Sequence, residues 1–180
     1  MLLTIDPSTG LGWTIGPFSP DTPNDQVSFG TVKLSTSTDV GAYLQSADEA
    51  LQDLMSRGIT AWAIEVMNTQ RSYHHAIVKG VAIYSHCLYT ARLLQLPPPT
   101  VFSPTEIKTT MTGNGLAKKP EIIAAAQLLG FDVKTDHEAD AIGIRRAYIF
   151  GVPEGKTERL KREAKERREA KEAAKGAKLL

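Results

Sequence analysis

The sequence predicts an α/β protein built on a mixed sheet of about five strands with helices on its faces. Three observations support this fold class. Residues 1–34 contain short apolar runs separated by turn-forming residues, whereas helical and strand-like patterns alternate further along the chain. The chain has 180 residues, of which 42% are hydrophobic, so it can form one well-buried domain.

The first part of the chain predicts a β-meander followed by a helix. Strands are expected over residues 2–6, 12–16 and 27–34, with a turn rich in proline and aspartate before the third. The pattern over residues 40–58 predicts an amphipathic helix that is closed by Gly58. Its apolar face consists of Leu44, Ala47, Leu51, Leu54 and Met55.

The second part of the chain alternates between strands and helices. Residues 59–67 form a nearly continuous apolar run, which is typical of a strand covered on both faces. A long helix is expected over about residues 73–95, where the prolines of LPPP end it. Its predicted buried stripe consists of Ile77, Val81, Tyr84, Leu88 and Ala91. The remaining elements are a strand at 100–103 and helices at 104–111, 119–130 and 136–151.

Charge and cysteine content narrow the class of protein. Residues 154–180 hold ten Lys or Arg and six Glu, a net charge of +4, which leaves −3 for residues 1–153. Such a mixed-charge tail is either a solvated helix or a contact to nucleic acid. The single Cys87 excludes an internal disulfide and a cysteine metal cluster. With no signal peptide and no span of ~20 apolar residues, we expect a cytoplasmic protein, bacterial or in an infected host, without a membrane partner.

Four polar residues occupy unusual positions in this pattern. Asp6 ends the first strand, in LLTIDPSTGLGW, and Glu65 ends the most apolar strand. His137 and Asp140 lie one turn apart on the predicted inner face of the last helix. A carboxylate on such a face is costly unless it is paired, hydrogen-bonded or bound to metal.

Each of these residues also has an ordinary interpretation. Asp6 can cap its own turn, Glu65 can be exposed, and His137 can belong to a helix cap with Asp136. Asp140 can pair with Arg145 or Arg146. Taken together, however, the four residues match what a hard cation such as Mg²⁺ requires. Two such ions about 3.5–4 Å apart can clamp both reacting oxygens of a phosphodiester.

Four segments then occur in a characteristic order: LTIDPSTGLGW, AWAIEVMN, PTEIKTTMTGNGLAKK and DHEADAIGI. Together they resemble the motifs of the RuvC family of Holliday-junction resolvases, within the RNase H-like superfamily. The resemblance covers about residues 2–150 and implies an RNase H-like nuclease domain over 1–152. Residues 153–180 remain as a charged, basic tail, helical or disordered, of a kind that suggests a phage- or virus-encoded member.

The resemblance also implies a reaction and the residues that perform it. Asp6, Glu65 and Asp140 fall on the family's catalytic, metal-binding carboxylates, and His137 falls on a position that is Asp in many members and His in some. The implied enzyme is a homodimer that makes paired, symmetric nicks in four-way DNA junctions. It would use two Mg²⁺ ions per active site, with Mn²⁺ able to substitute, and no small-molecule cofactor.

The implied DNA contacts come from lysines and from one loop. Lys108 and Lys119 match the family's DNA-binding lysines, with Lys118 as an additional neighbour. Asn68 stands where many relatives have an aromatic residue that wedges into the junction, and Tyr73 is the candidate substitute. The first loop, DPSTGLGW, is shorter than the usual Asp-Pro-Gly-Ser version.

Three alternatives remain open from the sequence. The same fold can act on forks, flaps or RNA–DNA hybrids. A DNA-binding module without catalysis is a second alternative, against which the complete set of four ligand positions argues. The third is a fragment of an actin-like ATPase or kinase, because DPSTG also fits a phosphate-binding turn, but that fold needs two domains and a second phosphate loop.

Removing residues 154–180 tests the basic tail. If the tail contacts DNA phosphates, truncation weakens nonspecific DNA binding and flattens its dependence on salt, because fewer counterions are released. Nicking of branched DNA should remain intact. Binding measured across a salt series checks this, and an unchanged salt slope would favour a solvated helix.

Overall fold

The computed structural model describes residues 1–8, 10–67, 74–154 and 165–166. Asn68, Tyr73 and most of the basic tail, to which the sequence assigns DNA contacts, lie outside the described residues. The strands are β1 (Leu2–Asp6), β2 (Gly10–Gly16), β3 (Ser28–Lys33), β4 (Ala61–Glu65) and β5 (Thr100–Phe102). The helices are α1 (Val40–Ser56), α2 (His74–Leu93), α3 (Pro104–Thr112), α4 (Lys119–Leu128) and α5 (Asp136–Phe150), with a 3₁₀ turn at Asn24–Gln26.

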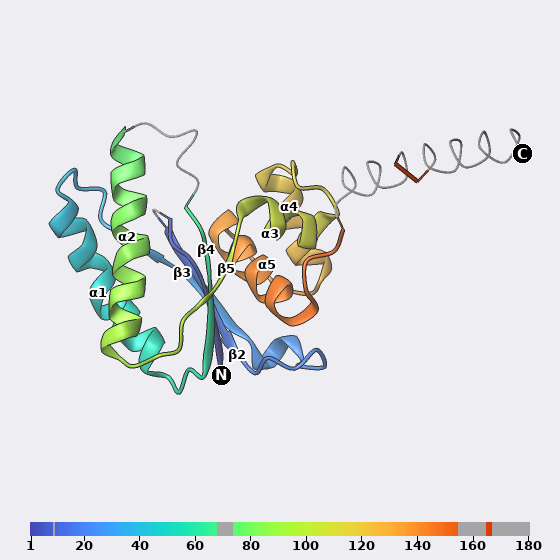
Figure 1. The fold of residues 1–180 in the computed structure, drawn as a ribbon, viewed down its shortest axis with the longest axis horizontal. Coiled ribbons are helices and arrows are strands. Elements are labelled where there is room, and N and C mark those ends of the chain that lie inside the picture. The colour runs from blue at the N-terminus through green and yellow to red at the C-terminus, as the bar shows by residue number, and fades with distance from the viewer. Residues whose placement is uncertain (9, 68–73, 155–164, 167–180) are drawn as a thin grey trace, which may run out of the picture.

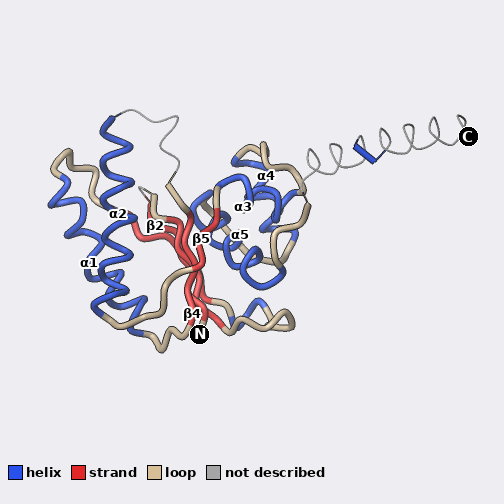
Figure 2. Tube along the Cα trace, in the orientation of Figure 1, coloured by secondary structure: helices blue, strands red, loops and turns tan. Residues whose placement is uncertain are grey.

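The five strands form one mixed sheet in the order β3-β2-β1-β4-β5. Strands β1, β2 and β3 are antiparallel neighbours, whereas β4 and β5 run parallel to β1. Helices α1 and α2 cover one face of this sheet, and α3, α4 and α5 lie on the other (Figures 1 and 2). This arrangement confirms the predicted α/β class and the five-stranded mixed sheet.

Alternation along the strands decides which side chains face which helices. On β1, Leu3 and Ile5 join the core beneath α1 and α2, while Thr4 donates a hydrogen bond to the Ala141 carbonyl of α5 at 2.8 Å. On β4, Trp62 and Ile64 belong to the first core, and Ala63 packs with α5 residues. By the same alternation, the strand-end residues Asp6 and Glu65 lie on the α5 side.

The buried face of α2 differs from the predicted stripe. The buried positions are Gly80, Ile83, Cys87, Thr90 and Ala91. Ala91 is therefore buried as predicted, and Tyr84 and Leu88 of the predicted stripe pack against the same core. The prediction was wrong at Val81, which is 45% exposed, and it did not include Ile83, Cys87 and Thr90. None of the helices in the described part of the chain combines the length and apolar character needed to cross a lipid bilayer.

Two glycines allow α5 to lie directly on β2. A Cβ atom at Gly12 would lie 2.1 Å from the His137 carbonyl oxygen, and one at Gly10 would lie 2.5 Å from His137 Cδ2. Both distances are shorter than any non-bonded contact with a real Cβ. The small residues after Asp6 therefore do more than turn the chain, since they let the first turn of α5 reach the end of β1.

Replacing Gly12 with alanine tests this close approach. The added methyl group must push the α5 backbone away from β2, and overpacking of this kind destabilises proteins by about 1–3 kcal/mol. Denaturant unfolding measures the change. Gly41→Ala in the exposed first turn of α1 is the control, with an expected change within about 0.5 kcal/mol. Equal stability of the Gly12 variant and the wild type would contradict the packing described.

Candidate active site

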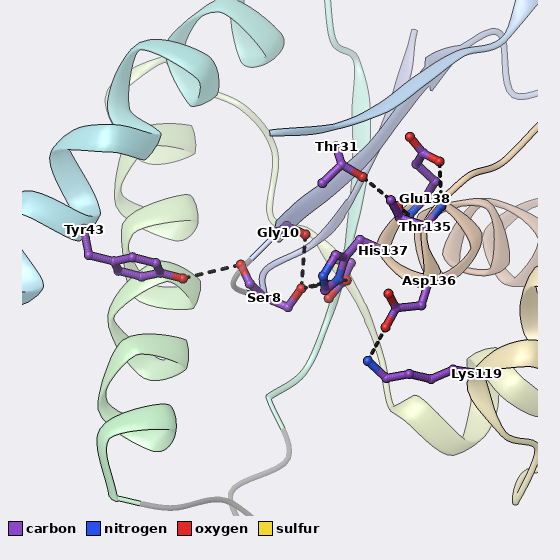
Figure 3. Close-up of polar contacts among 10 residues, drawn as sticks. Ser8, Gly10, Thr31, Tyr43, Lys119, Thr135, Asp136, His137 and Glu138 are labelled. Atoms are coloured by element: carbon purple, nitrogen blue, oxygen red, sulfur yellow. Dashed lines mark hydrogen bonds and ion pairs between the residues drawn. The ribbon is translucent and has the colours of Figure 1, made fainter. Parts of the chain in front are cut away.

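The structure brings together the carboxyl ends of strands β1 and β4 and the first turn of helix α5. Strands β1 and β4 are parallel neighbours with Ile5 paired to Ile64, so Asp6 and Glu65 follow at the carboxyl ends of adjacent strands. Ligand sites in α/β sheets commonly form at this edge. Helix α5 begins above the same edge and presents His137 within its first turn (Figure 3).

Asp6 is held by two hydrogen-bonding partners. His137 Nδ1 lies 3.0 Å from Asp6 Oδ2, and the Ser8 hydroxyl donates to the same carboxylate at 2.9 Å. Ser8 Oγ is also 2.7 Å from His137 Nδ1, as Figure 3 shows. The hydrogen bond that Asp6 accepts from the ring raises the pKa of His137, although burial opposes the shift. The imidazole thus holds a proton beside Asp6 more readily than in water.

The carboxylates repel one another. Burial, followed by the negative charges of Asp6 and Asp140, raises the pKa of Glu65 to about 9. Burial and the charge of Asp6, with Asp136 also contributing, raise the pKa of Asp140 to about 7. The positive charge of Lys108 opposes both shifts without cancelling them. This end of the sheet therefore gathers buried carboxyl groups whose ionised forms are unfavourable without a further cation.

The predicted lysines have different surroundings. Lys108 is half-buried on α3, and its charge acts on Glu65 and Asp140. Lys119 forms an ion pair with Asp136 next to His137 (Figure 3). Although burial opposes it, this pair lowers the pKa of Asp136. Lys118 is exposed at the start of α4.

A cavity of about 260 Å³ opens at this edge. Its lining includes Asp6, Ser8, Glu65, Lys119 and His137, together with Tyr43 and Gly80 from the α1–α2 side. Burial, with the nearby thiol of Cys87 and the charge of Asp6, raises the pKa of Tyr43 to about 12. Its hydroxyl therefore stays protonated and donates to the Ser8 carbonyl at 3.4 Å.

Two of the ordinary interpretations differ from what the structure shows. Thr135 and Glu138 form the capping box of α5, so His137 and Asp136 are not the cap. Arg145 donates to the Pro17 carbonyl rather than to Asp140. In the described part of the chain, no three His, Cys, Asp or Glu side chains lie close enough together, as they stand, to hold one ion.

Sequence reasoning missed three residues of the site. Ser8 holds Asp6, Tyr43 holds the turn, and Asp136 pairs with Lys119. Ser8 lies only two residues after Asp6 in the quoted turn, and Tyr43 lies one helical turn before Ala47 on the buried face of α1. The contacts that the sequence does not reveal are those of Ser8 with His137 and of Tyr43 with Ser8, because each joins residues far apart in the chain.

Replacing Glu65 with glutamine tests the concentration of negative charge. Between pH 4.5 and about 9 the folded protein holds the Glu65 proton more tightly than the unfolded chain, so wild-type stability falls as pH rises. Glu65→Gln removes this loss and raises the metal-free Tm at pH 8, by about 2–4 °C for each kcal/mol regained.

The matched control is Glu49→Gln, an exposed residue on α1, which should leave the pH profile as it is. Melting curves from pH 5 to pH 9 in a chelator make the comparison. If the Glu65 variant is less stable than the wild type at pH 8, then ionisation of Glu65 does not destabilise the folded protein.

Comparisons with known proteins place the fold. No protein-family model and no curated protein matches the sequence. A structure of RuvC from Thermus thermophilus matches at a TM-score of 0.64 and 20% identity, over 84% of this chain and 96% of that one. A structure of T. thermophilus RuvC in complex with a Holliday junction substrate matches at a TM-score of 0.63 and 20% identity, over 83% and 93%. The chain therefore has the RNase H-like fold seen in RuvC, as its sequence motifs predict.

Proposed function

We propose that this protein is a metal-dependent endonuclease that resolves four-way DNA junctions. The observation that carries the proposal is the convergence of Asp6, Glu65 and Asp140 at one edge of the sheet, where burial, followed by their mutual charges, raises the pKa of Glu65 and of Asp140. The structural likeness to RuvC supports it, and one of those RuvC structures is a complex with a Holliday junction substrate.

The donor set fits a divalent cation of the Mg²⁺ or Mn²⁺ type. Carboxylate oxygens are the preferred ligands of these ions, and excess negative charge favours their binding. Asp6, Glu65 and Asp140 would hold the metal, two ions in the mechanism that we favour. When bound, such ions activate water and stabilise charge on the phosphate. Because the three carboxylates do not yet surround a common point, we expect their side chains to move on binding.

His137 orients Asp6 in this account. Its Nδ1 faces the carboxylate, while the opposite side of the ring lies against Gly10. The imidazole can release its proton and become a ligand, or stay protonated and position Asp6. Ser8 supports either state, since its hydroxyl can donate to the carboxylate or interact with Nδ1.

Lysines provide the contacts to the DNA backbone. Lys108 lies close enough to Glu65 and Asp140 to act on their charges, so a phosphate bound there would sit beside the carboxylates. Lys119 lines the cavity, and Lys118 extends the positive charge along the surface. Since residues 1–153 carry a net charge of −3, affinity for DNA must come from such local groups.

A homodimer would place two such sites on one junction. Helix α2 exposes three large apolar side chains at intervals of four and eight residues: Val81 at 45%, Tyr89 at 61% and Leu93 at 63%. Residues with this spacing share one face of a helix. We propose that a second copy of the chain covers this face, because a four-way junction is itself roughly two-fold and paired nicks need two sites.

Asp6→Asn tests the catalytic assignment. The variant should bind a synthetic four-way junction as the wild type does but cut it about 10³-fold more slowly or not at all, because one metal-binding carboxylate is lost. Asp25→Asn, at an exposed position, is the control. Gel shift and nicking assays in Mg²⁺ separate the two properties. Undiminished Mg²⁺-dependent cutting by the Asp6 variant would refute the assignment.

The same assay defines the substrate. A mobile four-way junction, a fork, a flap and an RNA–DNA hybrid are compared under identical conditions, and ATP turnover is measured in parallel. We expect the junction to be cut fastest, at paired positions on opposite strands. Faster cutting of forks or flaps would retain the nuclease but change its substrate, and ATP turnover without nicking would favour the actin-like alternative.

Tyr89→Glu tests the dimer. A charge in the centre of the apolar face should turn a dimer into a monomer in analytical ultracentrifugation and uncouple the two nicks of a junction. Glu49→Lys, an exposed charge change on α1, serves as the control. A wild type that is monomeric at every concentration, with or without junction DNA, would contradict the proposal.

A further inference from the structure

A second group of cations lies at the other end of α5, away from the carboxylates. Arg145 is only 4% exposed, and its Nη2 donates to the Pro17 carbonyl. Arg145 Nη1 and Arg146 Nε are both buried and have no hydrogen-bond partner in the described part of the chain. Arg145 comes five residues after Asp140, about 7.5 Å along the helix. The pocket beside Arg145 and Arg146 shares no lining residue with the active-site cavity, so the two are separate.

The two arginines line a pocket of about 100 Å³. Its other walls come from the segment between β2 and β3, which includes Ser19, Thr22 and Asn24, and from apolar residues such as Ile142. Figure 1 shows this segment beside α5 at the end opposite the active site. The pocket is thus closed by two separate parts of the chain and is not a shallow surface feature.

The acids of the neighbouring segment do not balance these guanidinium groups. Among the described residues, neither Asp21 nor Asp25 forms an ion pair with Arg145 or Arg146. Burial lowers the pKa of Arg145, with no nearby negative charge to oppose it. A buried, unpaired charge is strongly unfavourable, and an unpartnered donor in a folded protein indicates a missing water or ion.

We propose that this pocket is a binding site for a phosphate-type oxyanion, held by Arg145 and Arg146. Guanidinium groups offer paired N–H donors that match two oxygens of one phosphate. Arg146 also lies over the Phe150 ring, with its Cζ atom 5.1 Å from the ring centroid, which is a cation–π contact. The phosphate comes either from the free ion or from a DNA backbone. The bound anion ties the β2–β3 segment to α5.

Thermal melting in inorganic phosphate tests the site. Phosphate should raise the Tm of the wild type, relative to chloride at equal ionic strength and pH, by about 3–6 °C at tenfold excess over Kd. Arg146→Gln should lose most of this increase, measured in the absence of DNA. The control is Arg57→Gln, which removes an exposed guanidinium paired with Asp53 and should respond like the wild type.

Ser19→Asp gives a second test that does not remove either arginine. Ser19 lines the pocket, and its Oγ accepts from Asp21 N at 3.3 Å, an interaction that a carboxylate can retain. The new carboxylate should replace the anion, so the variant melts higher than the wild type without phosphate and gains less from it. Equal phosphate responses in the wild type, Arg146→Gln and Ser19→Asp would overturn the proposal, as buried water would then satisfy the donors.

Junction binding distinguishes the two sources of phosphate. If DNA supplies it, Arg146→Gln weakens binding of a four-way junction and lowers the salt slope by about one. If the free ion supplies it, the variant binds the junction as the wild type does but retains its loss of phosphate response. A phosphate effect that depends on Arg146 supports the site in either case, whether or not the protein cuts DNA.

Discussion

The close contact between helix α5 and strands β1 and β2 is the constraint on which the rest of the structure depends. Gly10 and Gly12 leave no side chain between β2 and the first turn of α5, and Thr4 fixes the next turn through the Ala141 carbonyl. As a result, a helix distant in sequence begins directly above the end of β1. Any residue larger than glycine at these positions would move His137 away from Asp6.

This contact has an electrostatic consequence. It brings the acids of α5 toward two strand ends that already carry Asp6 and Glu65, and burial together with the mutual repulsion of these acids raises the pKa of Glu65 and of Asp140. Proteins tolerate such concentrations of charge mainly where function requires them. Lys108 and the proton on His137 offset part of the repulsion, and a divalent cation would offset the remainder. Stability and activity are therefore expected to oppose one another here.

Local patterns were sufficient to predict much of this arrangement. Strand alternation and helix periodicity predicted all five strands and all five helices to within a few residues, and the ends of β1 and β4 directed attention to Asp6 and Glu65. The buried face of α2 was predicted only in part: Tyr84, Leu88 and Ala91 contact the core, but Val81 is exposed, and Cys87 and Thr90 are buried although they carry little hydrophobic signal. Ser8, Asp136 and the paired arginines of α5 could not be assigned from sequence, since each depends on a partner brought in by tertiary folding.

The central claim is that Asp6, Glu65 and Asp140 form one divalent-metal site beside His137. Anomalous diffraction at the manganese edge, from crystals grown with Mn²⁺, tests it most directly. The account predicts manganese density between the ends of β1 and β4 and the first two turns of α5, with the carboxylates turned inward. Manganese bound only elsewhere, with this edge of the sheet unchanged, would contradict it.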